Sequence, residues 1–333
     1  MATLIDKYII AEIGSVHDGS FGNACKLIEA AAAAGADAAK FQTHIASAET
    51  LKDAPMPHYF KGEPRFEYFE RTGFSLSQWK ALKQVCQDNG VIFLSSPFSL
   101  EAVDLLEEVG VEAYKVPSGE VTNIPLLDRI AKTGKPTILS SGMNDWAELD
   151  SAMAALKPGG PITILQCASA YPCPPERVGL NLIGEMKERY GTAVGYSDHT
   201  LGFAAAISAA TLGATIIEKH FTFSKLMYGS DAIHSLEPLE FKVFCNAIRE
   251  TWAMIAAPVN KDDVSPYTDM KLIFEKSIVA GRGIKSGSIL TLEDLAFKKP
   301  GDGIPAADYK LVIGQAVKAD LPADHKFIED DFV

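Results

Sequence analysis

One phrase, repeated along the chain, decides the fold: AAGADAAKF at residues 33–41, EVGVEAYKV at 108–116, TGKPTILS at 133–140 and LGATIIEKH at 212–220. In each, a helix-like segment reaches a glycine and is followed by a short apolar run that closes on a polar residue. Glycine commonly ends helices, and short apolar runs between helical segments are typical of buried strands. The repeat therefore predicts alternating helices and strands.

Eight runs of this kind are predicted strands: Tyr8–Glu12, Ala38–Gln42, Ile92–Ser95, Ala113–Val116, Thr137–Ser140, Ile162–Gln166, Ala193–Ser197 and Ile216–Glu218. Segments of helical period lie between them, at 23–34, 76–89, 100–109, 124–132, 146–156, 182–190 and 203–212. Eight such units in about 250 residues match an α/β fold of the (β/α)8 TIM-barrel type. An open doubly wound sheet stays possible, although no GxGxxG follows the first strand.

The pattern changes after Ala257, where PVNKDDVSPY combines proline and charge as linkers do. From Ser277 onward, short strand-like runs alternate with glycine turns. We predict a barrel domain over 1–257, a linker over 258–276 and a small β-rich domain over 277–333. A domain of that size has a marginal core, so we expect it to pack on a neighbour.

One connection is unusually long. Between Thr43 and Ser75 the chain carries DAPMPHYFKGEPRFEYFERTGF, and loops beyond about 15 residues are usually functional or disordered. Two interpretations stay open: a lid over the barrel mouth, or a packed surface excursion. Both would use its aromatic and basic residues, which are Tyr59, Phe60, Phe66, Tyr68, Phe69, Lys61, Arg65 and Arg71.

The composition excludes several classes of protein. The 333 residues contain 31 Lys and Arg against 43 Asp and Glu, a net charge of −12, which disfavours nucleic acid or an anionic membrane as partner. The five cysteines form no CxxC, which argues against a disulfide framework or a zinc ribbon. The chain shows no signal peptide and no apolar run long enough to span a bilayer. We expect a soluble, cytoplasmic protein whose anionic ligands are held by local cations.

Polar residues stand where the predicted strands end, which is where barrel enzymes carry their chemistry. Capping alone hardly explains so many of them, so we expect a site. They are Glu12, Lys40, Gln42, Ser95, Ser96, Lys115, Ser118, Glu120, Ser140, Ser141, Gln166, Ser197, His199, Glu218, Lys219 and His220.

Two histidines, His199 and His220, end consecutive strands, so both imidazoles can face one point. Such a pair suits a divalent cation of the Mn, Co or Zn type, with positions left open for water and a substrate oxygen. A satisfied polar pair is the plainer alternative. Asp198 is expected either to orient His199 or to cap the next helix. The remaining histidines that lack such support, His44, His58 and His325, are expected on the surface or in loops.

Lys40 and Lys115, with nearby serine hydroxyls, fit a cradle for phosphate and carboxylate groups. Pairing of these lysines with Glu12 and Glu120 is the structural alternative, and both can hold at once. A desolvated Schiff-base lysine, which would need no metal, is a sharper alternative. Asp231, in the polar loop 229–238, is expected either to bind substrate hydroxyls or to serve a turn.

A set of motifs resembles the sialic acid synthase family, in the same order over nearly the whole chain. The motifs are AEIGSVHDGS at 11–20, KFQTH at 40–44, SSPFS at 95–99, YKVPSGE at 114–120, LSSGM at 139–143, SAYPCP at 169–174, GYSDHT at 195–200 and EKHF at 218–221. The tail resembles the antifreeze-like, or SAF, domain of that family, a β-clip fold, with KKPGDGI at 298–304. Each phrase is weak alone, but the ordered set is specific.

The resemblance implies a transferase that condenses phosphoenolpyruvate with an N-acylated mannosamine-type aldose, giving a nonulosonic acid and phosphate. It implies a divalent metal, most often Mn²⁺ with Mg²⁺ or Co²⁺ possible, on His199 and His220. It also implies a homodimer that swaps its small domains. Phosphoenolpyruvate would contact Lys40, Ser96, Lys115, Ser118, Ser140, Ser169 and Ser197. The sugar would contact Gln42, Glu120, Tyr171 and Asp231, while Glu12 would handle protons.

Some positions depart from the family pattern. Val16 and Ser169 each stand where an Asn is usual, and Lys299 replaces an Arg that reaches the N-acyl group from the partner's small domain. Because lysine lacks the two-pronged donor of arginine, a modified or deoxy sugar is expected as acceptor. Two other functions stay open: a 3-deoxy-ulosonic acid synthase acting on a phosphorylated sugar, and a catalytically silent sugar-binding protein.

Overall fold

The computed structural model describes residues 7–55 and 62–333. It contains two compact units, Met1–Ala257 and Pro258–Val333, and each is described by itself. His58, Tyr59, Phe60 and Lys61 of the long excursion lie outside the described residues. None of the described helices is both long and apolar enough to cross a membrane.

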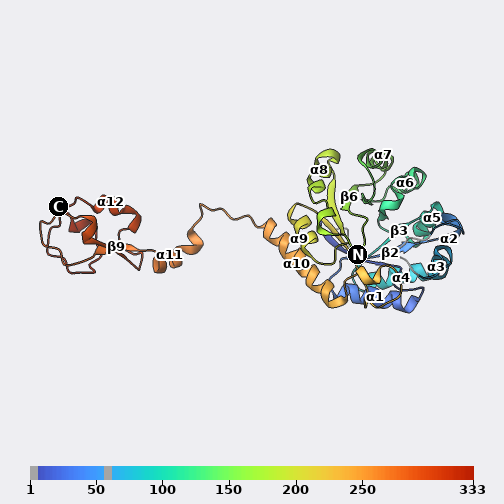
Figure 1. Cartoon of the computed structure of the whole chain (residues 1–333), viewed down its shortest axis with the longest axis horizontal. Coiled ribbons are helices and arrows are strands. Elements are labelled where there is room, and N and C mark those ends of the chain that lie inside the picture. The colour runs from blue at the N-terminus through green and yellow to red at the C-terminus, as the bar shows by residue number, and fades with distance from the viewer. Residues whose placement is uncertain (1–6, 56–61) are drawn as a thin grey trace. The chain divides into compact units, whose positions relative to one another are not determined.

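The first unit is a parallel barrel surrounded by helices (Figure 1). Its strands are β1 (Tyr8–Gly14), β2 (Ala38–Thr43), β3 (Ile92–Pro97), β4 (Tyr114–Val116), β5 (Thr137–Ser140), β6 (Ile162–Cys167), β7 (Ala193–Asp198) and β8 (Ile216–His220). They follow the order β3-β2-β1-β8-β7-β6-β5-β4, and β3 and β4 lie side by side. The predicted TIM barrel is confirmed, and the doubly wound alternative is wrong because the first strand pairs with the eighth.

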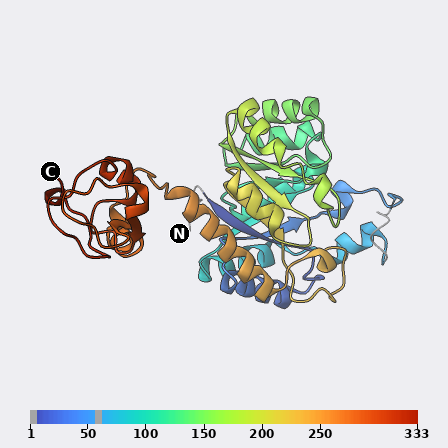
Figure 2. The same cartoon turned by 60° about the vertical axis from the view of Figure 1, so that its left-hand side comes forward.

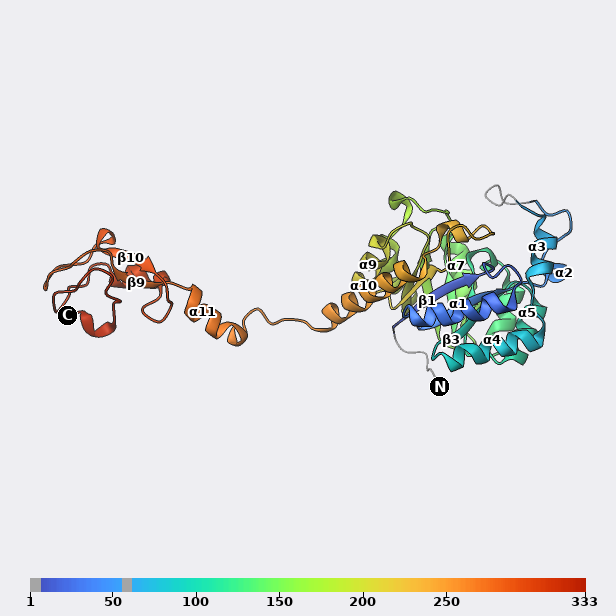
Figure 3. The same cartoon turned by 90° about the horizontal axis from the view of Figure 1, so that it is seen from below.

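The helices of this unit are α1 (Phe21–Ala33), α2 (Ala46–Glu49), α3 (Arg65–Thr72), α4 (Leu76–Asp88), α5 (Leu100–Val109), α6 (Ile124–Ala131), α7 (Trp146–Leu156), α8 (Asn181–Tyr190), α9 (Ala204–Thr211) and α10 (Pro238–Ala256). Short 3-10 turns lie at η1 (Ser118–Glu120), η2 (Pro175–Arg177) and η3 (Ala232–His234). Figures 2 and 3 show α2 and α3, which belong to the long excursion, projecting at one end of the barrel.

Alternation along the strands sorts side chains between the barrel interior and the helical layer, as the period of two requires. In β1, Ile9 and Ala11 pack in the cluster beneath the helices, whereas Tyr8 and Ile10 belong to a separate buried cluster. That second cluster fills the barrel interior below the carboxyl ends of the strands. It consists of Tyr8, Ile10, Ala38, Ile92, Leu94, Ala113, Ile138, Leu165 and Ile216. The barrel is therefore plugged from within, and a ligand cavity is left only above the plug.

The second unit has its own small core around two antiparallel strands, β9 (Ser277–Ala280) and β10 (Leu295–Lys298). Its helical elements are η4 (Ser265–Tyr267), α11 (Thr268–Phe274), η5 (Leu292–Asp294), η6 (Ala306–Asp308), α12 (Tyr309–Val312) and η7 (Glu329–Asp331). The segment 258–276, which the sequence suggested as a linker, thus carries η4 and α11. The core consists of Ile278, Ala280, Ile284, Leu290, Leu295, Val312, Val317, Leu321 and Phe327.

The substitution Gly195→Ala, which adds one methyl group, tests the interior packing of the barrel. A Cβ there would lie 2.4 Å from Leu165 Cδ2 and 2.5 Å from the Ile216 carbonyl oxygen, and the latter belongs to a neighbouring strand that cannot easily move. We expect Gly195→Ala to lower the free energy of unfolding by about 1–3 kcal/mol, measured by urea denaturation.

The matched control is Gly184→Ala on the exposed side of α8, where no described atom lies within 4 Å of the added Cβ. Because alanine favours a helix interior over glycine, this variant should be unchanged or stabilised by up to about 1 kcal/mol. Equal stability of both variants and the parent would contradict the packing described.

Candidate active site

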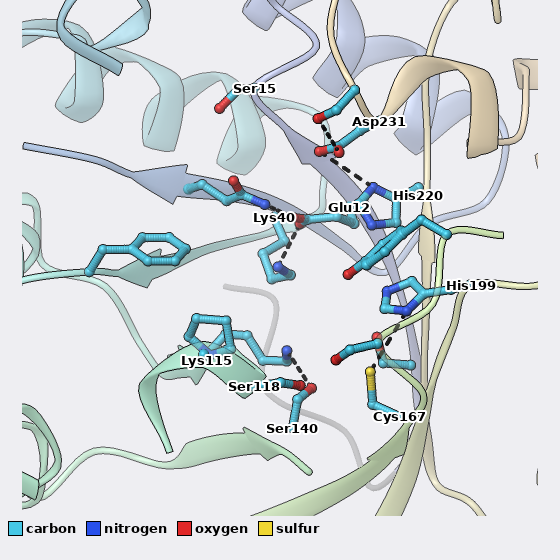
Figure 4. A pocket seen from close by; sticks show the side chains of 18 of the residues that line it. Glu12, Ser15, Lys40, Lys115, Ser118, Ser140, Cys167, His199, His220 and Asp231 are labelled. Carbon is cyan, nitrogen blue, oxygen red and sulfur yellow. Dashed lines mark hydrogen bonds and ion pairs between the residues drawn. The ribbon is translucent and has the colours of Figure 1, made fainter. Parts of the chain in front are cut away.

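A cavity of about 410 Å³ opens at the carboxyl ends of the barrel strands, above the apolar plug. Figure 4 shows Lys40 and Lys115 pointing into the same space as His199 and His220. The lining residues are Glu12, Ser15, Lys40, Gln42, His44, Arg65, Tyr68, Phe69, Phe98, Lys115, Pro117, Ser118, Gly119, Ser140, Met143, Cys167, Ser169, Tyr171, Ser197, His199, Glu218, His220, Ser230 and Asp231.

Four buried charges form the floor of this cavity. Lys40 Nζ lies 2.7 Å from Glu12 Oε2 and 3.8 Å from Glu218 Oε2, and Lys115 Nζ lies 3.4 Å from Glu218 Oε1. The interior alternation explains this grouping, because Glu12 pairs in register with Lys40 on β2 and with His220 on β8. The expected pairing of the lysines with carboxylates is therefore present, but the second carboxylate is that of Glu218 and not that of Glu120.

The two carboxyl groups respond differently to this environment. Burial opposes ionisation of Glu218, but Lys115 and Lys40 outweigh it and lower the pKa to about 2. Burial raises the pKa of Glu12 above its ordinary value, although Lys40 acts in the opposite direction. Glu218 is thus a fixed counter-charge, and Glu12 is the more readily protonated of the two carboxyl groups.

The pKa values of the two lysines are also shifted in different directions. Burial disfavours the charge of Lys40, yet Glu12 and Glu218 raise its pKa, whereas burial lowers the pKa of Lys115 despite Glu218. Lys115 Nζ donates to Ser140 Oγ at 2.7 Å, and Ser197 Oγ donates to Glu218 at 3.0 Å. Cations and hydroxyl donors at this spacing suit phosphate and carboxylate oxygens.

Gly142 keeps this cradle open. A Cβ at Gly142 would lie 2.1 Å from Ser118 Oγ and 2.3 Å from Ser169 Oγ, so only a glycine allows the two hydroxyls to face the cavity together. The hydroxyl groups of Ser118 and Ser169, both predicted site residues, therefore lie close together beside a backbone position that has no side chain.

His199 and His220 face each other across the adjoining wall, with ring centroids 5.5 Å apart. His199 Nδ1 lies 2.9 Å from the Ala168 carbonyl oxygen, to which only its N–H form can donate, so Nε2 carries the lone pair. His220 Nδ1 is buried and finds no hydrogen-bond partner among the described residues; Asp231 Oδ2 lies 3.9 Å away. Burial lowers the pKa of His220 to about 4, which keeps this imidazole neutral.

The donor chemistry therefore fits a divalent cation held by two imidazoles. Among residues 7–55 and 62–333, no group of three or more His, Cys, Asp or Glu residues is arranged to hold a metal. A closed structural site is thus absent from this part of the chain, whereas two imidazoles beside a cavity leave positions for water and substrate oxygens.

Several expectations about the site need correction. Glu120 is not among the described residues that line the cavity; its carboxylate accepts a hydrogen bond from Asn123 at 2.8 Å. Ser96 is fully buried and reaches the site only through Lys40 Nζ, at 3.5 Å. Lys299 is exposed in the second unit, with its ammonium 4.8 Å from the Phe274 ring centroid, and its expected contact with a partner's barrel stays a prediction.

Asp198 neither orients His199 nor caps a helix. Its carboxylate pairs with Lys219 at 2.8 Å, and both side chains are completely buried outside the barrel interior. Lys219 Nζ also donates to the carbonyl oxygens of Thr200 and, at 3.3 Å, of Gly202. Lys219 thereby holds the loop that carries His199, a role that its position in EKH did not reveal.

One wall of the cavity combines a histidine that was expected elsewhere with residues of the possible lid. His44, expected on the surface or in a loop, is 8 % exposed and lines the cavity with Arg65, Tyr68 and Phe69 of the excursion. Cys167 also lines it, with Sγ 3.8 Å from His199 Nδ1. Alternation along the strand after Gln166 offered a signal for Cys167. Glu218 was already among the expected strand-end residues, and Arg65 was named only as a basic residue of the possible lid.

Fold and site together define the class: a (β/α)8-barrel protein with a cation-lined anion cradle and an imidazole pair at the carboxyl ends of its strands. The chain belongs to the NeuB family, whose model matches residues 27–260, and a SAF domain matches residues 275–331. Both predicted resemblances are confirmed.

Related proteins cover nearly the whole chain. An N,N'-diacetyllegionaminic acid synthase of Campylobacter jejuni is 38 % identical over 325 residues, covering 95 % of this chain and 97 % of that protein. The human N-acetylneuraminate-9-phosphate synthase is 33 % identical, covering 97 % and 92 %. A solved N-acetylneuraminic acid synthetase from Leptospira borgpetersenii, in complex with citrate, matches 80 % of this chain and 90 % of its own with a TM-score of 0.69 and 30 % identity.

The Lys219–Asp198 pair generates a stability prediction. Lys219→Met leaves the Asp198 carboxylate buried and unpaired, so the free energy of unfolding should fall by about 3–5 kcal/mol in chemical denaturation. Lys225→Met is the control, because it breaks an ion pair with Glu240 whose side chains are 39 % and 42 % exposed, and should cost less than about 1 kcal/mol.

The double variant Lys219→Met with Asp198→Asn separates the two contributions. It removes the stranded charge and should recover part of the loss, as coupled neighbours do. If the loss of stability in the double variant equals the sum of the losses in Lys219→Met and Asp198→Asn, the pairing is contradicted.

Proposed function

We propose that this chain is a nonulosonic acid synthase that condenses phosphoenolpyruvate with an N-acylated mannosamine-type aldose and releases phosphate. The observation that carries the proposal is the charged floor at Lys40 and Lys115 beside the pair His199 and His220 in one cavity. The relatives, which are synthases of legionaminic acid and of neuraminic acid phosphate, support the same reaction type.

Phosphoenolpyruvate is assigned to the cradle. Its phosphate and carboxylate groups are acceptors only, and Lys40, Lys115 and the hydroxyls of Ser118, Ser140 and Ser169 supply donors from several strands. Glu218, which stays ionised between the lysines, limits the positive charge of the site in the absence of ligand. The substrate therefore enters a preorganised cradle rather than an unpaired cluster of cations.

A divalent cation, Mn²⁺ in first place, is assigned to His199 and His220, where it would polarise the aldehyde oxygen of the acceptor. His199 is oriented by the Ala168 carbonyl group, and its loop is held by Lys219. Tyr171 lies against this imidazole, with ring centroids 4.1 Å apart, and restricts its movement.

The reaction balances with one water molecule. The methylene carbon of phosphoenolpyruvate bonds to the aldehyde carbon, water adds to the carbon that bears the phosphate, and the C–O bond to phosphate breaks. Glu12 is placed to accept the proton of that water, because burial raises its pKa and Lys40 holds its carboxylate in position. Asp231 and Gln42, which also line the cavity, are assigned to acceptor hydroxyls.

The homodimer with exchanged small domains and the role of Lys299 also belong to this proposal and rest on the resemblance. The proposed cytoplasmic location rests on the composition and the cysteine pattern. Analytical ultracentrifugation of the full chain tests the dimer.

The reaction is tested by measuring phosphate release from phosphoenolpyruvate with Mn²⁺ and a panel of amino sugars. We expect release only with N-acylated mannosamine-type aldoses, together with formation of a nine-carbon keto acid detected by mass spectrometry. Phosphate release only with phosphorylated aldoses, such as a five-carbon aldose that gives an eight-carbon acid, would favour the ulosonic acid alternative. Binding of sugar without any turnover would favour the silent binding protein.

Removal of one imidazole tests the metal assignment. His220→Ala should reduce Mn²⁺-supported phosphate release at least about a hundredfold and weaken Mn²⁺ binding measured by calorimetry, because one of two ligands is lost. His325→Ala, which changes a histidine of the second unit, serves as control and should retain both properties. Unchanged Mn²⁺ affinity in His220→Ala would overturn the assignment.

Removal of one cation tests the cradle. Lys115→Met loses a charge-assisted hydrogen bond worth about 1.5–3 kcal/mol, so the KM for phosphoenolpyruvate should rise about 10–100-fold while the KM for the sugar changes little. The exposed Lys80→Met on α4 is the matched control and should behave as the parent. An equal rise in both KM values would argue against phosphoenolpyruvate at this position.

A further inference from the structure

The two lysines of the cavity floor differ in how well their charges are compensated. Lys40 Nζ lies 2.7 Å from Glu12 Oε2 and also 3.8 Å from Glu218 Oε2. Among residues 7–55 and 62–333, Lys115 pairs with the Glu218 carboxylate alone, at the longer distance of 3.4 Å, and it shares this carboxylate with Lys40. The ammonium group of Lys115 is therefore the less well compensated of the two.

The surroundings of Lys115 favour its neutral amine form. The residue is 2 % exposed, and the titratable groups that face it are Glu218, Lys40, Cys167 and Glu12. Burial is the largest effect, and together with the charge of Lys40 it lowers the pKa of Lys115, although the carboxylates oppose the shift. Lys40 differs, because Glu12 and Glu218 outweigh burial and raise its pKa. Without a bound anion, Lys115 is thus the lysine that loses its proton more readily.

A neutral lysine amine is a nucleophile toward carbonyl groups. Lysines that form imines are typically desolvated or placed beside another cation, and Lys115 meets both conditions. Its side chain lines the cavity, so a small carbonyl compound in the cavity can reach Nζ. Ser140 Oγ accepts a hydrogen bond from this nitrogen at 2.7 Å, and its hydroxyl group is placed to pass a proton to a departing oxygen.

The donors around Lys115 indicate which carbonyl compound fits. Figure 4 shows Ser118 and Ser140 beside the Lys115 ammonium group, and the hydroxyl of Ser169 gathers with that of Ser118 at Gly142. Hydroxyl donors next to a cation that keeps its charge, as Lys40 does, suit a carboxylate. A ligand that binds these donors through a carboxylate and offers Lys115 an adjacent carbonyl carbon is a 2-oxo acid.

We propose that Lys115 is a covalent modification site for short 2-oxo acids such as pyruvate, with which it forms a reversible imine. The amine adds to the ketone carbon, and the adduct then loses its hydroxyl group and a nitrogen-bound proton as one water molecule. Water reverses the step, and no oxidant or reductant takes part. The inference goes beyond the proposed condensation and does not depend on it, because it rests on the lysine pair and the hydroxyl groups of the cavity.

An imine at Lys115 changes what the cavity binds. It removes one cation of the cradle and places a carboxylate among the hydroxyl groups of Ser118 and Ser140. A second anion is thereby excluded until the imine is hydrolysed. In the proposed reaction, a 2-oxo acid is therefore a reversible competitor of phosphoenolpyruvate.

The test traps the imine in the full chain with cyanoborohydride, which reduces the C=N bond to a stable amine. The protein is incubated with pyruvate near neutral pH, and modified lysines are identified by peptide mass spectrometry. We expect at least about tenfold more label at Lys115 than at the exposed Lys80, because a pKa one unit lower gives about tenfold more free amine. Excess phosphoenolpyruvate should suppress the label at Lys115 and leave that at Lys80 unchanged.

Two small molecules and one variant are the matched controls. Lactate keeps the carboxylate of pyruvate without its ketone, and acetone keeps the ketone without the carboxylate, so neither should label Lys115 above Lys80. Lys115→Arg retains a cation that cannot form an imine, and it should lose the label while Lys40 stays unlabelled. Label on Lys40 in place of Lys115, label on Lys115 no stronger than on Lys80, or equal labelling by acetone and pyruvate would overturn the inference.

Trapping requires no turnover, so the inference and the proposed function fail separately. A protein that forms the Lys115 adduct but releases no phosphate with any aldose, or whose adduct phosphoenolpyruvate does not suppress, supports the imine and contradicts the proposed function. Phosphate release by a protein in which pyruvate leaves Lys115 unlabelled does the reverse.

Discussion

The need to balance four buried charges inside the barrel governs this structure. Lys40 and Lys115 are buried in the barrel interior, and each would lose its charge or destabilise the fold without a carboxylate partner. Glu12 and Glu218 supply the partners at 2.7 and 3.4 Å, from strands on either side of the β1–β8 pairing. The same ion pairs hold both ammonium groups at the floor of the cavity.

Everything else in the cavity is organised around that floor. The apolar cluster that ends at Ile10 and Leu165 closes the barrel below it, so ligands approach only from the loops. Outside the barrel, Lys219 and Asp198 form a second buried pair that fixes the loop of His199. The neighbouring residues Glu218, Lys219 and His220 thus serve three purposes, because alternation sends the first and third inward and the second outward.

The excursion between β2 and α4 packs on the barrel and supplies part of the cavity lining. Its helix α3 is attached through Arg71, and Tyr68 donates to the Ser15 carbonyl oxygen at 3.5 Å. The described part is therefore packed against the barrel and also supplies cavity lining, so the two interpretations of the excursion are not exclusive. The barrel strands carry the buried charges and the imidazole pair, whereas the excursion adds Arg65, Tyr68 and Phe69 to the lining of the cavity.

The sequence by itself determined the strands, most helices and the inward groups Glu12, Lys40, Lys115 and His220, because period-two alternation and glycine-ended helices are local properties that each segment shows without its neighbours. It could not distinguish Glu120 from Glu218 as the partner of the lysines. Which side chains meet depends on how strands close into a ring, and that closure joins β1 to β8, more than half the chain apart. For the same reason only the tertiary structure assigned Asp198 to Lys219 and brought His44 and Arg65 to the cavity: their partners lie on other elements, and long-range packing leaves no pattern in the local sequence.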